Sequence, residues 1–110
     1  MLTVTDMDTL ARYGRGVLAR AKHHGANIMR VLPDILGNTI LRGTELELYG
    51  DGTKNAMFFT SVRTGRRYAM SYDHDAGAVQ LKEGSLQGPV LQRINNSTGR
   101  ERVAEIFEAL

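Results

Sequence analysis

Residues 44–94 contain five short segments separated by turns: TELELY (44–49), AMFFTSV (56–62), RRYAMSY (66–72), AVQLKE (78–83) and PVLQRI (89–94). In TELELY, leucine and glutamate alternate, which is typical of a strand with one dry face and one wet face. The connecting segments are rich in Gly and Asp, and Thr64-Gly65 has the composition of a tight hairpin turn. We therefore predict a four- or five-stranded antiparallel β-meander at the centre of the fold.

Two helical segments are expected before the meander. Residues 6–22 carry apolar side chains at helical spacing and predict an N-terminal helix. Residues 27–36 show a similar stripe with Asn27 as a candidate cap, but Pro33 removes a backbone donor in its middle. We predict a second, short helix interrupted at Pro33, after which Gly37 and Asn38 return the chain to the sheet. A strand over residues 28–32 is the alternative.

A C-terminal helix is predicted after the meander. Thr98 and Glu101 form a capping-box pattern, T-x-x-E, ahead of apolar residues spaced at i, i+3, i+4 and i+7. A helix of this length is marginal alone, so we expect it to pack on the sheet. The predicted fold class is α+β, in one domain that spans residues 1–110.

Composition narrows the class of protein. The chain has 110 residues, of which 42% are hydrophobic and 24% charged, as in an ordinary globular protein, and its net charge is +2. It has no cysteine, which excludes disulfides, thiolate catalysis and cysteine-ligated metals. No apolar run approaches the roughly 20 residues of a membrane span, and the N-terminus does not resemble a signal peptide. We expect a cytoplasmic protein.

Motifs for catalysis or for cofactor binding are absent. The segment Gly50-Asp51-Gly52-Thr53-Lys54 lacks the spacing of a phosphate-binding loop and suits a hairpin connection. Asp73-His74-Asp75 suits a polar turn better than a metal site, because consecutive side chains point in different directions. We predict no metal and no cofactor, and a binding protein is favoured over an enzyme.

Basic residues give one functional hypothesis. Arg63, Arg66 and Arg67 flank the Thr64-Gly65 turn with tyrosines on the strand that follows, and Arg12 and Arg15 lie on the first helix. On one shared surface they would suit single-stranded nucleic acid or an acidic protein partner. A helix–helix–meander layout with such a patch resembles the RelE/ParE-type toxins, some of which cut messenger RNA on the ribosome. The resemblance concerns layout, and no family motif is matched residue by residue.

Apolar residues give two further hypotheses. Met57, Phe58 and Phe59 are consecutive, so their strand is apolar on both faces; either the chain covers both faces, or one meets a second subunit. Residues sharing a sheet face would line a small-molecule pocket or form the core: Met57, Phe59, Tyr68, Met70 and Tyr72. We expect a small homo-oligomeric binding module, with a nucleic-acid-binding protein or ribonuclease and a small-molecule binder as alternatives.

Overall fold

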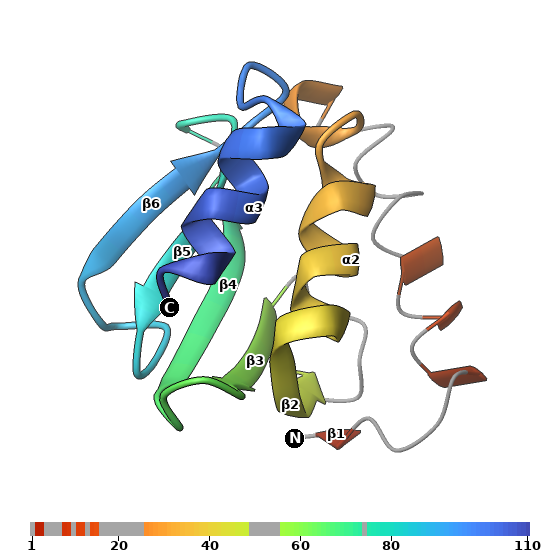
Figure 1. Ribbon diagram of the computed structural model, residues 1–110. Coiled ribbons are helices and arrows are strands. Elements are labelled where there is room, and N and C mark those ends of the chain that lie inside the picture. Colours follow the sequence, from red (N-terminus) through yellow and green to blue (C-terminus); the bar gives the residue numbers. More distant parts are fainter. Residues whose placement is uncertain are drawn as a thin grey trace.

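The computed structural model of the chain describes residues 2, 3, 8, 9, 11, 12, 14, 15, 26–48, 56–73 and 75–110, arranged as Figure 1 shows. Its described strands form one antiparallel sheet in which each strand pairs with the next along the chain. The strands are β1 (Leu2–Thr3), β2 (Gly43–Leu48), β3 (Ala56–Ser61), β4 (Arg67–Asp73), β5 (Ala78–Glu83) and β6 (Val90–Ile94). Strands β2 to β6 confirm the predicted meander as a five-stranded one. The sequence does not predict β1, because two residues are too few to show alternation.

Two α-helices, α2 (Leu32–Arg42) and α3 (Arg100–Glu108), lie side by side on one face of this sheet (Figure 1). Ion pairs join them near both ends. Arg100 Nε lies 3.3 Å from Asp34 Oδ1, and Arg42 Nη2 lies 3.1 Å from Glu108 Oε1. The α+β class is therefore confirmed, with both helices in a single layer.

Helix α2 starts later and runs further than predicted. The residues before it form a 3₁₀ turn, η1 (Ala26–Ile28), and Pro33 lies in the first turn of α2 itself. The missing N–H of a proline is not needed there, so the helix continues without interruption through Gly37 and Asn38 to Arg42. The predicted short helix interrupted at Pro33 is wrong, because proline starts this helix instead of breaking it.

A distant side chain satisfies the backbone groups ahead of α2. Asn96 Oδ1 accepts hydrogen bonds from the amides of Arg30 (2.8 Å) and Val31 (3.1 Å), and its Nδ2 donates to the carbonyl of Ala26 (2.9 Å). The N-cap residue of α2 is Val31, which makes no capping bond of its own. The predicted cap at Asn27 is therefore wrong.

The predicted N-terminal helix is described over part of its length. Within the predicted helix at 6–22, residues 8, 9, 11, 12, 14 and 15 are helical, and the rest lies outside the described residues. A Cβ added to Gly14 would lie 3.7 Å from Leu36 Cδ1, so this segment packs beside α2.

At α3 the N-cap is Gly99, and the Thr98 hydroxyl accepts a hydrogen bond from the amide of Asn95 (3.2 Å). The predicted capping box is wrong, because that hydroxyl serves the preceding turn.

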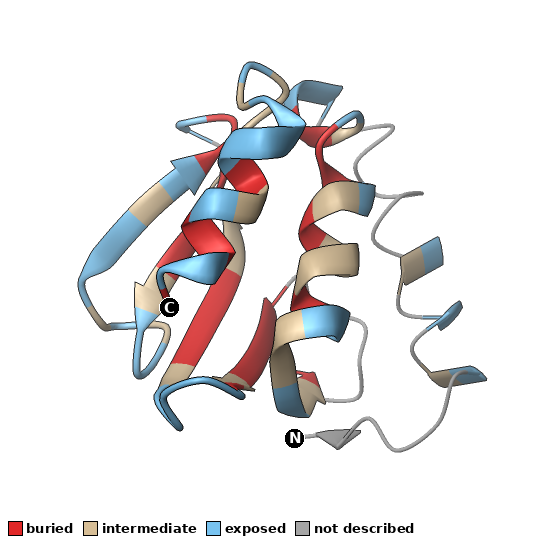
Figure 2. Ribbon diagram, viewed as in Figure 1, coloured by how far each residue is buried: buried red, intermediate tan, exposed pale blue. Residues whose placement is uncertain are grey.

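The hydrophobic core lies between the sheet and the two helices (Figure 2). Phe59 is at its centre, with its ring centroid 5.6 Å from that of Tyr68 on β4 and 5.8 Å from that of Phe107 on α3. The packing of the C-terminal helix on the sheet is thereby confirmed. Among the described helices, none has the length and apolar character needed to cross a membrane. The buried strand residues of this core are Leu48, Met57, Phe59, Tyr68, Met70, Val79, Leu81 and Ile94.

Candidate interaction surface

The five arginines predicted as a binding patch fall in two separate places. Arg63 and Arg66 lie in the turn between β3 and β4, and Arg67 begins β4. Arg12 and Arg15 are exposed on the described part of the N-terminal helix. Figure 1 shows this turn and that helix well apart, so the structure does not bring the five residues onto one surface.

Arg67 is engaged on the sheet face that points away from the helices. Its guanidinium carbon lies 5.2 Å from the centroid of the Phe58 ring, and its Nη2 lies 2.6 Å from Glu47 Oε1. Phe58 is only 7% exposed beneath this ion pair. The strand with apolar side chains on both faces is therefore covered within one chain, by α2 and α3 on one side and by Arg67 and its neighbours on the other.

Arg63 binds the backbone of the residues that follow α3. Its Nε donates to the Leu110 carbonyl oxygen (3.1 Å), and its Nη2 donates to that of Ala109 (3.0 Å). The buried hydroxyl of Ser61 donates to the same Leu110 oxygen (3.0 Å), and the Leu110 side chain is itself buried. These bonds fasten the residues after α3 to the β3–β4 turn, which assigns Arg63 a structural role.

The β3–β4 turn has the geometry that its sequence predicts. The Ser61 amide donates to the Arg66 carbonyl (2.8 Å), and the Gly65 amide donates back to the Ser61 carbonyl (2.8 Å). Gly65 has φ +72°, a conformation that glycine adopts without steric cost. The turn holds Arg66 out into solvent, where the residue is exposed.

Exposed aliphatic side chains lie next to this turn. Leu41 is 79% exposed in the last turn of α2, and Val62 is 66% exposed just after β3. A hydrogen bond from the Val62 amide to the Arg42 carbonyl (3.0 Å) joins the two segments. Figure 2 shows the end of α2 and the β3–β4 turn as neighbouring exposed stretches. We call Leu41, Arg42, Val62, Arg63 and Arg66 the turn surface.

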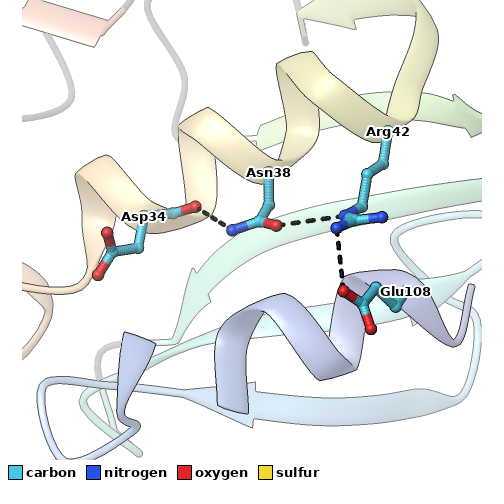
Figure 3. Close-up of polar contacts among 4 residues, drawn as sticks. All are labelled: Asp34, Asn38, Arg42 and Glu108. Carbon is cyan, nitrogen blue, oxygen red and sulfur yellow. Dashed lines mark hydrogen bonds and ion pairs between the residues drawn. The ribbon is translucent and has the colours of Figure 1, made fainter. Parts of the chain in front are cut away.

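Arg42 connects this surface to both helices, as Figure 3 shows. Its Nε donates to Asn38 Oδ1 (3.4 Å) and its Nη2 to Glu108 Oε1 (3.1 Å), while Asn38 Nδ2 donates to the Asp34 carbonyl (2.9 Å). The Arg42 side chain is nevertheless 39% exposed. It therefore keeps part of its positive charge accessible at the edge of the turn surface.

The residues predicted as an oligomer interface or pocket lie mostly in the interior. Four of them, Met57, Phe59, Tyr68 and Met70, belong to the core cluster, and Tyr72 is half-buried against it. Phe58 is buried on the opposite face of the sheet. An interface or a pocket at these six residues stays a prediction.

The polar turn at residues 73–75 uses its carboxylate internally. Asp73 Oδ1 accepts from the Asp75 amide (3.0 Å), and Asp73 Oδ2 accepts from Gln80 Nε2 (2.9 Å). His74 lies outside the described residues. Within the described ranges, no group of three or more His, Asp and Glu side chains is placed to hold a metal ion.

Comparison with known families identifies the chain at the level of family. Residues 10–103, which include α2 and the whole meander from β2 to β6, match a family model described as "Integron cassette protein VCH_CASS1 chain". The chain belongs to this family. No curated protein matches its sequence. The family description states no activity, so the function of this integron cassette protein must be argued from its surface.

Sequence reasoning found only part of the turn surface. Arg63 and Arg66 were among the predicted residues of this integron cassette protein, whereas Leu41 and Val62 were not. Leu41 was missed because α2 was expected to end before it, and Val62 because it continues an apolar strand. The sequence carries no local signal that exposes Leu41, because adjacent apolar residues of this helix, such as Ile35 and Leu36, both pack on the core.

Proposed function

We propose that this integron cassette protein is a binding module whose turn surface docks an acidic protein segment that carries an apolar side chain. The observation that supports this most directly is the exposure of Leu41 (79%) and Val62 (66%) on adjoining segments. Large apolar side chains that gather in solvent and are bordered by polar groups are typical of protein contact sites. The other exposed large apolar side chains of the described residues have lower exposed fractions.

The sign of the partner's charge follows from the charged groups around these two side chains. Arg42, Arg63 and Arg66 border the turn surface, and Glu108 is the acidic side chain paired with one of them. The exposed Glu45 accepts a hydrogen bond from Thr60 Oγ1 (3.2 Å), two residues before Val62. Three arginines against two glutamates still leave a positive rim, which attracts an acidic segment and speeds its encounter. Arg66 is the most available member, because Arg42 is ion-paired and Arg63 holds the residues after α3.

A protein partner is favoured over single-stranded nucleic acid. Proteins that bind single strands stack bases on exposed aromatic rings, and the centre of the turn surface is aliphatic. Tyr68, the first tyrosine after the turn, is 3% exposed and cannot serve as a stacking platform. Arg67 is held over Phe58, which removes it from the turn.

NMR titration of the ¹⁵N-labelled chain tests the proposal with three probes. These are a peptide of alternating Glu and Leu, its counterpart of alternating Lys and Leu, and a single-stranded RNA oligonucleotide. We expect the acidic peptide alone to shift the amides of residues 40–42 and 61–66. Binding should weaken as salt is added, because the rim attraction is screened.

Variants make this test specific for the turn surface. The Leu41→Ser/Val62→Ser double variant should lose the peptide shifts, whereas Leu91→Ser, which removes an exposed leucine on β6, should keep them. Shifts that persist in the double variant would place the contact elsewhere and refute the proposal, as would equal loss in both variants. RNA shifts at the turn without peptide shifts would favour the nucleic-acid alternative.

A further inference from the structure

One arginine of the turn surface already holds a carboxylate of the same chain. Glu108 Oε1 accepts a hydrogen bond from Arg42 Nη2 (3.1 Å), and the side chains of Arg42 and Glu108 are 39% and 56% exposed. An ion pair this open to water changes an equilibrium constant by no more than about fivefold, because solvent screens the attraction and two long side chains lose freedom. Another carboxylate can therefore replace Glu108 at a small cost in free energy.

Arg42 is held in place by contacts that do not involve Glu108. Its Nε donates to Asn38 Oδ1 (3.4 Å), and Asn38 Nδ2 donates to the Asp34 carbonyl (2.9 Å), as Figure 3 shows. The Arg42 carbonyl accepts from the Val62 amide (3.0 Å), which holds its backbone against the β3–β4 turn. The guanidinium group therefore stays beside the turn surface after Glu108 leaves, and its Nη atoms can bind both oxygens of an incoming carboxylate.

We propose that Glu108 is an internal competitor for the acidic partner of the turn surface, an inference that rests on the function proposed above. A carboxylate of the partner displaces Glu108 from Arg42, while the partner's apolar side chain packs on Leu41 and Val62. Leu41 directly precedes Arg42, so the apolar and the charged contact lie side by side. Arg42 thus selects an acidic partner, and Glu108 lowers the affinity for every such partner by occupying part of the Arg42 population.

The other two arginines of the turn surface do not have such a competitor. Arg63 donates to the carbonyl oxygens of Ala109 and Leu110, and these bonds are tied to a side chain of Leu110 that is buried. Replacing them would require that this buried side chain move. Arg66 makes no ion pair with any described residue, so a partner displaces nothing there. The competition is therefore specific to Arg42.

Glu105 offers a matched control on the same helix. Its side chain is 63% exposed and pairs with Arg102 (3.3 Å), which does not belong to the turn surface. Glu108→Gln and Glu105→Gln remove the same charge from α3, but only the first releases Arg42. Comparing the two variants separates the local competition from the effect of net charge, which acts over a longer range.

Isothermal titration calorimetry with the peptide of alternating Glu and Leu tests the competition. Glu108→Gln should lower the dissociation constant about two- to fivefold relative to the unmodified chain, because Arg42 is then free in every molecule. Glu105→Gln should change it by less than about 1.5-fold, because the charge that it removes is screened. Arg42→Gln should weaken binding, and adding Glu108→Gln to it should give no gain beyond that of Glu105→Gln.

The side-chain Nε–H signals of the arginines follow the exchange directly in ¹⁵N NMR spectra. The acidic peptide should shift the signal of Arg42 and leave that of Arg102 in place. Glu108→Gln that binds no more tightly than Glu105→Gln would overturn the competition, as would a gain from Glu108→Gln that persists when Arg42 is replaced. A peptide that binds neither the unmodified chain nor Glu108→Gln would contradict the proposed function itself, so the two failures are distinguishable.

Discussion

Replacing Asn96 by Ala should lower the free energy of unfolding more than most single polar substitutions. The side chain serves three backbone groups ahead of α2, namely the amides of Arg30 and Val31 and the carbonyl of Ala26. Val31 is fully buried, so water cannot easily replace the lost acceptor at its amide. Leaving a buried donor unsatisfied costs about 1–3 kcal/mol, and the two more exposed groups add less, so we expect a loss of about 2–3 kcal/mol.

Urea denaturation followed by far-UV circular dichroism measures this loss, and two variants serve as controls. Asn96→Asp keeps the oxygen that accepts both amides but loses the donor to Ala26, so its loss should be smaller, about 1 kcal/mol. Ser97→Ala alters an exposed neighbour whose observed bond is made by its backbone amide, so it should change stability by less than about 0.5 kcal/mol. If Asn96→Ala is no less stable than Ser97→Ala, the capping role of Asn96 is refuted.

Two further substitutions test other parts of the structure. Arg63→Ala should cost about 1–2 kcal/mol and speed hydrogen exchange at the end of α3, because two hydrogen bonds to the residues after that helix are lost. Arg66→Ala in the same turn should cost less than about 0.5 kcal/mol, and equal costs for the two arginines would contradict the structural role of the first. Gly43→Ala should cost about 2–3 kcal/mol in thermal unfolding, because its Cβ would lie 2.7 Å from the Thr39 carbonyl oxygen and 3.0 Å from Phe59 Cδ2. An unchanged melting temperature would show that the backbone relaxes there without strain.

The meander was predictable because each strand carries its own local signal. Alternation and hairpin turns act over a few residues, and no distant contact is needed to recognise them. The start of α2 was not predictable in the same way. Pro33 is compatible with either the first turn or a break, and Asn96, which decides between them, is more than sixty residues away. The failed cap at Thr98 has a local origin instead, since the hydroxyl accepts a hydrogen bond from the amide of Asn95, three residues before it.

The candidate site was only partly predictable, because a cluster of arginines in sequence does not show what each side chain contacts. Arg63 and Arg67 look alike beside the Thr64-Gly65 turn, yet one holds the residues after α3 and the other lies over Phe58. The partners of Arg63 are 46 and 47 residues away in the sequence, and the hairpin pattern, which does pair the strands of Phe58 and Arg67, does not show that this arginine lies over that ring. Exposure also depends on which face of α2 a residue occupies: Leu41 is exposed, although Thr39 is fully buried and a Cβ at Gly43 would lie 3.0 Å from the core residue Phe59.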